Sequence, residues 1–70
     1  METKRQKFVR LAERRTTKAV DAIANISSLS NTRSYEYNED DVKKILSAIR
    51  EACNQVQVAF KSKEKITFKL

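Results

Sequence analysis

The sequence predicts an all-α fold in which two long antiparallel amphipathic helices form a helical hairpin, completed as a four-helix bundle by dimerisation. Glycine and proline are both absent from the 70 residues, which removes the commonest breakers of regular structure and favours a few long elements. Apolar residues recur at helical spacing along two stretches of the chain. The second stretch opens with a complete helix start signal at Asn38.

The first helix is expected over about residues 4–28. This helix has one apolar face, and Arg15 projects within that face. There Arg15 can extend its aliphatic stem to place the guanidinium in water, or it can pair with a carboxylate across an interface. The face is broad enough to be buried against another helix. At helical spacing it holds eight apolar residues: Phe8, Leu11, Ala12, Ala19, Ala22, Ile23, Ile26 and Leu29.

The second helix is expected over about residues 39–61. Asn38 is a good N-cap, and Tyr37 before it can pack on Val42 as a hydrophobic staple. Three acids then occupy the first turn: Glu39, Asp40 and Asp41. Negative charge at this position stabilises the positive end of the helix dipole, so we expect the helix to begin at residue 39.

An apolar seam continues from this start at spacings of three, four and one, which is typical of helices that pair with one another. Its members are Val42, Ile45, Leu46, Ile49, Ala52, Cys53, Val56, Ala59 and Phe60. We interpret Cys53 as a small hydrophobe of this seam, because a reactive thiol would need an exposed, electropositive setting. The predicted oligomer interface consists of seven seam residues: Val42, Ile45, Leu46, Ile49, Cys53, Val56 and Phe60.

A polar loop over residues 29–38 joins the helices, and a tail over residues 62–70 completes the single domain 1–70. The tail alternates polar and apolar residues from 65 to 70, which is the pattern of a short C-terminal strand. In an antiparallel dimer, the segment 35–37 of the other subunit could pair with that strand. A disordered tail is the simpler interpretation of a terminus.

Oligomerisation is expected because 70 residues bury too little surface for a stable single chain. One cysteine and no histidine exclude an internal disulfide and leave no ligand set for zinc or an iron-sulfur cluster, so we expect no cofactor and no metal. A homo-oligomer remains, with a dimer favoured. The basic N-terminus leads into no apolar run of signal-peptide length, and a cytoplasmic protein without a membrane span is therefore expected.

The net charge of +6 is concentrated toward the two ends of the chain. Residues 1–18 hold seven bases against two acids, and residues 61–70 hold four bases against one acid, whereas residues 19–60 hold four bases against six acids. In a hairpin both basic ends would lie at one pole, which favours a polyanion such as nucleic acid or an acidic protein partner. Net charge that serves only solubility is an equally good explanation.

Four of the bases form a basic stripe on one flank of the first helix: Lys7, Arg10, Arg14 and Lys18. Together with Lys4 and Arg5 they are the candidate nucleic-acid contacts, able to follow a phosphate backbone without reading sequence. A solvated helix face would show the same pattern, and we rank that interpretation first. Binding to an anionic membrane ranks below both, because the apolar face is rich in alanine and lacks tryptophan.

No catalytic residues are predicted, and an enzyme with a small-molecule substrate is not expected. Histidine is absent, so no side chain is tuned for acid-base chemistry near neutral pH, and the lack of glycine excludes a phosphate-cradling loop. The only acidic cluster, Glu39 to Asp41, is better explained by helix capping than by cation binding. Tyr35 could stack on a base or anchor a partner, although packing within the loop also accounts for it.

Parts of the chain resemble a group of short uncharacterised bacterial proteins carried on plasmids, prophages and integrative elements of Gram-positive bacteria. The resemblance lies in KFVRLAERR from Lys7, ISSLSN from Ile26, YEY from Tyr35 and DVKKI from Asp41, and it is most specific between Ser30 and Val42. It covers about residues 5–60 and leaves out the C-terminal ITFKL. It implies a bacterial cytoplasm and an accessory role in the maintenance or transfer of a mobile element, and it assigns no site residues.

Two functional hypotheses follow from these patterns. The first is a protein-interaction or structural module that self-associates through the seam of the second helix. The second is an accessory protein that binds nucleic acid without sequence specificity through the basic stripe on the first helix.

Overall fold

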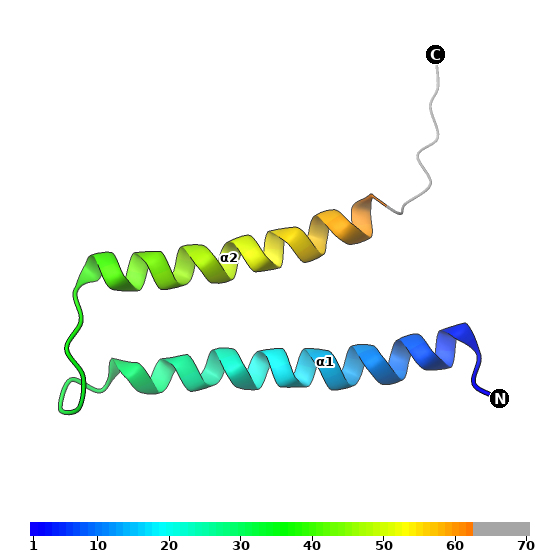
Figure 1. Cartoon of the computed structure of the whole chain (residues 1–70), viewed down its shortest axis with the longest axis horizontal. Helices are drawn as coiled ribbons and strands as arrows, with labels where there is room; N and C mark the ends of the chain where they lie inside the picture. Colours follow the sequence, from blue (N-terminus) through cyan, green and yellow to red (C-terminus); the bar gives the residue numbers. More distant parts are fainter. Residues whose placement is uncertain (63–70) are drawn as a thin grey trace, which may run out of the picture. The chain divides into compact units, whose positions relative to one another are not determined.

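The computed structural model of the chain describes residues 1–62, and the strand predicted at residues 65–70 lies outside them. The described elements, in chain order, are α1 (Lys4–Ile26), the 3-10 turn η1 (Ser27–Ser30) and α2 (Glu39–Lys61) (Figure 1). The first structural unit, Met1–Glu36, contains α1 and η1, and the second, Tyr37–Leu70, contains α2.

Helix α1 begins with a capping box formed by Thr3 and Gln6. The Thr3 hydroxyl accepts a hydrogen bond from the Gln6 amide at 3.0 Å, and the Thr3 amide donates to Oε1 of Gln6 at 2.9 Å. Two amides that the helix leaves without an intrahelical partner are thereby satisfied. This capping box is the physical cause of the helix start at Lys4.

The end of α1 differs from the prediction. The α-helix stops at Ile26 rather than at residue 28, and the chain continues as the 3-10 turn η1. The hydroxyl of Ser27 donates to the carbonyl of Ala24, and that of Ser28 donates to the carbonyl of Asn25 at 2.8 Å. Serine hydroxyls that bond to nearby carbonyls in this way compete with the regular helical pattern, which explains the tighter last turn.

The connection between η1 and α2 is organised by Asn31. Its side-chain oxygen accepts from the amide of Arg33 at 3.1 Å, and its carbonyl accepts from the amides of Ser34 and Tyr35 at 3.1 and 3.0 Å. An asparagine that bonds to the backbone two residues ahead stabilises a turn. Within residues 1–62 no residue has a positive φ, so the connection is made without glycine.

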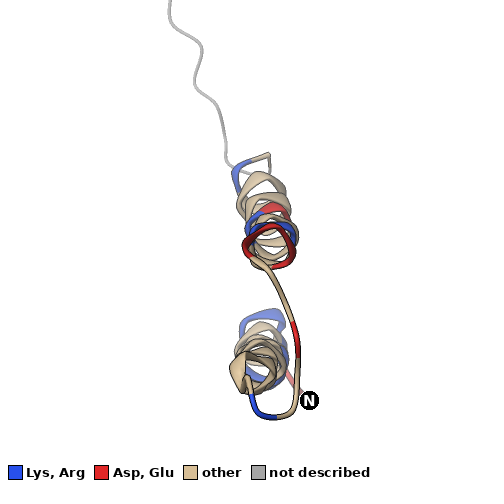
Figure 2. Cartoon of the chain, turned by 90° about the vertical axis from the view of Figure 1, so that its left-hand side faces the viewer, with Lys and Arg blue, Asp and Glu red and all other residues tan. Residues whose placement is uncertain are grey.

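Helix α2 has the bounds that the sequence predicts, and Asn38 is its N-cap. The Asn38 side chain accepts from the amide of Asp41 at 2.9 Å, while the Asp41 carboxylate accepts from the amide of Asn38 at 3.0 Å. The three acids of the first turn are red in Figure 2. Asp40 also forms an exposed ion pair with Lys44 at 3.1 Å. Reciprocal capping and the dipole together explain why the helix begins here.

The all-α fold class with two long amphipathic helices is confirmed, while dimerisation and a four-helix bundle stay predictions. None of residues 1–62 is buried. The partly buried ones are Val9, Leu11, Ala12, Ile26 and Ile49. Within residues 1–62, neither long helix is sufficiently apolar over its length to cross a membrane.

Candidate functional site: an apolar seam on α2 and a basic stripe on α1

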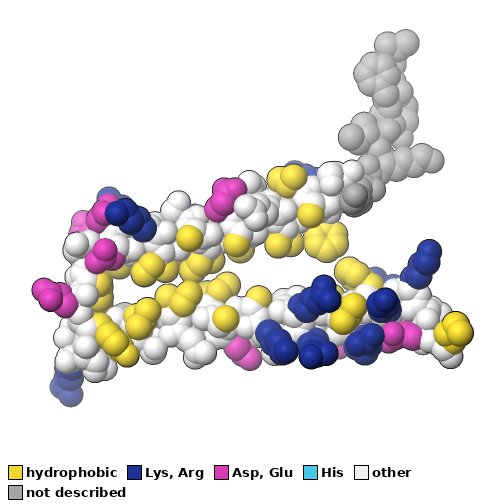
Figure 3. Space-filling view, in the orientation of Figure 1, with side chains coloured by type: hydrophobic (Ala, Val, Ile, Leu, Met, Phe, Trp, Pro, Cys, Tyr) yellow, Lys and Arg dark blue, Asp and Glu magenta, His cyan; other side chains and the backbone are white. Residues whose placement is uncertain are grey.

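Nine apolar residues of α2 fall into three columns that repeat every seven residues. The columns are Val42, Ile49 and Val56, then Ile45, Ala52 and Ala59, then Leu46, Cys53 and Phe60. We call these nine residues the α2 seam. At 3.6 residues per turn the three columns span about 100° of the helix surface. Figure 3 shows the corresponding apolar side chains along one edge of α2.

Most of the α2 seam is open to solvent. The exposed fraction is 37% at Val42 and 36% at Ile45, near the start of the helix, and 57% at Val56 and 60% at Phe60, near its end. Ile49, at the middle of the first column, is the single partly buried residue of α2. A continuous apolar stripe that stays exposed over five turns is uncommon on a protein that acts as a monomer, and such stripes mark interaction surfaces.

Two exposed residues of α2, Cys53 and Val58, lie on different faces of the helix. Cys53 lies in the third column between Leu46 and Phe60, and its thiol is free and exposed. Val58 is also exposed, at 55%, but it lies about 160° around the helix from Val42. Val58 is therefore about as exposed as Val56 of the α2 seam, but it lies on the opposite face of the helix.

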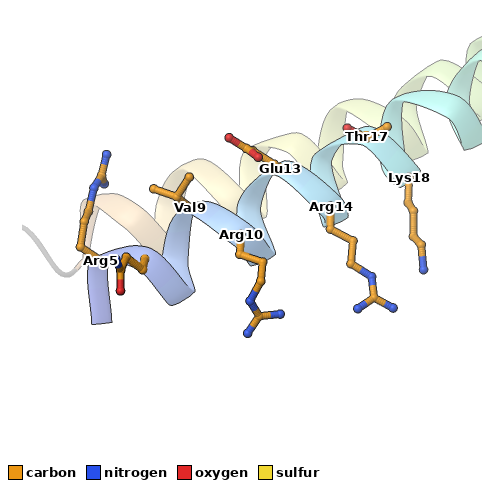
Figure 4. Close-up of a pocket in the computed structure, with 8 residues that line it drawn as sticks. Arg5, Val9, Arg10, Glu13, Arg14, Thr17 and Lys18 are labelled. Carbon is orange, nitrogen blue, oxygen red and sulfur yellow. The ribbon is translucent and has the colours of Figure 1, made fainter. Parts of the chain in front are cut away.

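The basic stripe of α1 has an open, shallow groove beside it. Its lining consists of Arg5, Gln6, Val9, Arg10, Glu13, Arg14, Thr17 and Lys18. Figure 4 shows Arg10, Arg14 and Lys18 extending from one side of the helix, whereas Arg5 and Glu13 extend from the other side of this surface. The structure thus brings together three of the six predicted nucleic-acid contacts in one row, at spacings of four residues.

Arg10 is held by a carboxylate that precedes the helix. Its Nε donates to Oε2 of Glu2 at 2.8 Å, and its Nη2 donates to Oε1 of Glu2 at 3.1 Å. The hydrogen bond to Glu2 raises the pKa of the Arg10 guanidinium, and a smaller effect of desolvation lowers it. Arg10 therefore stays positively charged, but two of its nitrogen atoms, Nε and Nη2, already donate to Glu2.

The other predicted contacts have different surroundings. The guanidinium of Arg5 lies over the ring of Phe8, 5.6 Å from its centre, which is a cation-π arrangement. Lys4 and Lys7 are exposed and do not line the groove. In the described part of the chain no ion pair involves Arg14 or Lys18. Within the row of Arg10, Arg14 and Lys18, these two cations are thus the ones available to an anionic partner.

A second shallow hollow lies at the start of α2. Its lining consists of Tyr37, Asn38, Glu39, Val42 and Lys43. Tyr37 and Val42, the two residues of the predicted staple, border the same hollow, and the staple contact itself stays a prediction. Residues 1–62 contain no cluster of three side chains suited to a metal ion.

Comparisons with known proteins returned no matching family model, no similar curated protein and no similar solved structure. The resemblance to short proteins of Gram-positive mobile elements therefore stays a prediction.

Proposed function

We propose that the protein is a self-associating helical interaction module that acts by binding rather than by catalysis. The observation that carries this proposal is the exposed α2 seam, which presents three apolar columns over nearly the whole of α2. Following the resemblance noted above, the proposed setting is a bacterial cytoplasm and the proposed role is that of an accessory protein of a mobile element.

The energetics of the α2 seam support association. Moving a valine, leucine, isoleucine or phenylalanine side chain from water into an apolar interior contributes about 1.5–3 kcal/mol. Six of the nine seam residues are of these types: Val42, Ile45, Leu46, Ile49, Val56 and Phe60. Exposed side chains do not make this contribution, and a second subunit can bury them.

The width of the α2 seam supports more than a simple helix pair. Two columns are enough for a two-stranded coiled coil, whereas three columns are typical of a helix that contacts two neighbours in a bundle. A four-helix bundle formed from two chains provides such neighbours for each α2. The composition also provides few groups suited to catalysis, since histidine and glycine are absent.

The test replaces Ile49, the central residue of the α2 seam, by aspartate. Light scattering coupled to size exclusion measures the mass, and circular dichroism measures the helix content. We expect the parent chain to be a dimer or tetramer and Ile49→Asp to weaken association by at least about 100-fold, because a buried unpaired carboxylate costs several kcal/mol.

The matched control is Val58→Asp, which introduces the same charge on the opposite face of α2. It should keep the mass of the parent chain. If Ile49→Asp also keeps that mass, or if the parent chain is a folded monomer, the proposal fails.

A second candidate function is non-sequence-specific binding of nucleic acid, and the row of Arg10, Arg14 and Lys18 supports it. Because Arg10 is paired with Glu2, two cations of the row, Arg14 and Lys18, would each neutralise one phosphate, and a plot of log affinity against log salt concentration would have a slope of roughly −2 on duplex DNA. Reversal of Lys7, Arg10 and Arg14 to glutamate should abolish binding without unfolding the chain. Reversal of Arg33, Lys43 and Arg50, which lie outside the basic stripe, is the control. Binding that ignores salt would exclude this function.

A further inference from the structure

The α2 seam has a gradient of side-chain size along its length. Its N-terminal half, from Val42 to Ile49, carries branched aliphatic residues throughout. Its C-terminal half, from Ala52 to Ala59, carries small residues at three of its four seam positions. Phe60 closes the seam at the last turn. The side chains of the seam are therefore bulky from Val42 to Ile49, mostly small from Ala52 to Ala59, and large again at Phe60.

We propose that each α2 pairs with the α2 of a second copy of this chain in antiparallel orientation, in a register where opposed residue numbers add up to about 101. This inference rests on the proposed self-association and specifies its geometry. Val42 then lies opposite the partner's Ala59, Ile45 opposite the partner's Val56, and Ile49 opposite the partner's Ala52. The two helices cross their twofold axis between residues 50 and 51.

Packing favours this orientation. In the antiparallel register the first two columns of the α2 seam face each other, and each layer that they form combines a larger residue with a smaller one. This keeps the distance between the two helix axes even and fills the space between them. A parallel, in-register pair would place Ile45 on Ile45 and Ile49 on Ile49 at one end. It would place Ala52 on Ala52 and Ala59 on Ala59 at the other. The first end would be forced apart and the second would contain cavities.

Charge favours the same orientation. The first turn of α2 carries Glu39, Asp40 and Asp41, and the last turn carries Lys61. An antiparallel pair places each acidic first turn near the basic last turn of the other helix and also opposes the two helix dipoles. A parallel pair would bring the six carboxylates of the two first turns together at one end. Only one of these acids in each chain, Asp40, is paired with a lysine, Lys44.

Helix α1 is a poorer occupant for the centre of this interface. Arg15 stands one heptad from Phe8 and one heptad from Ala22, so the apolar face of α1 is interrupted by a guanidinium in its middle. The three columns of the α2 seam contain no charged residue between Val42 and Phe60. A second α2 can therefore cover the α2 seam without burying a charge, which α1 cannot do along its whole length.

The test measures distances between spin labels on the full-length chain. Single cysteines replace Lys43, Arg50 or Gln57 in a chain that also carries Cys53→Ser. These three positions lie in one column outside the α2 seam, so that they differ only in their height along the helix. Circular dichroism and light scattering show whether each labelled chain keeps the helix content and mass of the parent.

Antiparallel pairing predicts distances that are shortest at the middle position. In the proposed register the two labels are offset along the axis by about 22 Å at residue 43, about 1.5 Å at residue 50 and about 20 Å at residue 57. A short distance at 50 with clearly longer distances at both 43 and 57 supports the inference.

The other outcomes separate this inference from the proposed function. Three equal distances in an associated protein would establish a parallel pair, which overturns the antiparallel inference and leaves self-association intact. An associated protein with no short distance at 50 would show that the two α2 helices are not neighbours, and the inference fails. A chain that is monomeric before labelling overturns the inference and the proposed function together.

Discussion

Glu2 and Arg10 form a two-pronged ion pair across eight residues, with Nε to Oε2 at 2.8 Å and Nη2 to Oε1 at 3.1 Å. Glu2 precedes the N-cap, so its carboxylate lies beside the first turns of α1 and meets an arginine that extends back toward the start of the helix. The pair neutralises one member of the row formed by Arg10, Arg14 and Lys18.

Releasing Arg10 from this pair should strengthen binding to a polyanion. For Glu2→Gln we expect higher affinity for a short DNA duplex at low salt. We also expect the slope of log affinity against log salt to become steeper by about 1, because one more cation is free to neutralise a phosphate. Fluorescence anisotropy over a salt series measures both quantities.

Glu13→Gln is the control for this experiment. It changes the net charge of α1 by the same amount, but within residues 1–62 Glu13 has no ion pair with the basic stripe. If the two variants behave alike, the effect of Glu2→Gln comes from net charge, and the specific role of Arg10 is refuted.

The N-cap of α2 should contribute measurably to stability. Asn38→Ala removes the side-chain acceptor for the Asp41 amide, and we expect it to lower the free energy of unfolding by about 0.5–2 kcal/mol. Urea unfolding followed by circular dichroism, at one fixed protein concentration, measures the change.

The same substitution inside α2 provides the comparison. Asn54 lies in the exposed middle of the helix, where alanine is the better helix former, so Asn54→Ala should leave stability equal or slightly higher. Equal losses for Asn38→Ala and Asn54→Ala would contradict the capping argument.

Much of α2 could be predicted from the sequence because its signals are local. The Asn38 cap, the acidic first turn and the seven-residue repeat all act within one or two turns, and the bounds of the helix agree with the prediction. The Thr3–Gln6 capping box is equally local and carried a readable signal, a threonine followed three residues later by glutamine.

Other features had no readable signal. The Glu2–Arg10 pair spans eight residues and depends on the direction of the chain before the cap, which helical spacing rules do not describe. The sequence also grouped six cations as one candidate site. In the structure Arg5 lies over Phe8, while Arg10, Arg14 and Lys18 form the row, because positions four apart share a side of the helix and position 5 does not.

Arg15 gives a test of whether the apolar face of α1 is covered in the proposed assembly. Replacement by leucine removes a charge from this face, and we expect the assembled protein to gain about 1.5–3 kcal/mol if the new side chain is fully buried. Thermal melting at several protein concentrations measures the gain. Arg14→Leu, one residue away on the basic flank, should give no gain; an equal gain there would show that helix propensity alone is responsible.

The reaction rate of the Cys53 thiol measures whether a partner covers the α2 seam. Its thiol is exposed in the single chain, so a water-soluble disulfide reagent should react with it quickly in dilute protein. As the protein concentration rises and the α2 seams pair, the reaction rate of the thiol should fall by on the order of tenfold or more. A thiol covered by a partner can react only when the interface opens. In the double variant Cys53→Ser, Asn54→Cys the thiol points away from the seam, and its rate should not depend on concentration.

No residue between 1 and 62 is buried, so the proposed self-association would link the amount of folded protein to the amount that is made. For a chain whose stability comes from its partner, the folded fraction depends on concentration as well as on temperature. Chains that remain single would expose the α2 seam to proteases and to unrelated apolar surfaces. The cell would then accumulate this protein above a threshold of synthesis and clear it below, so that a modest change in gene dose would produce a sharp change in its level.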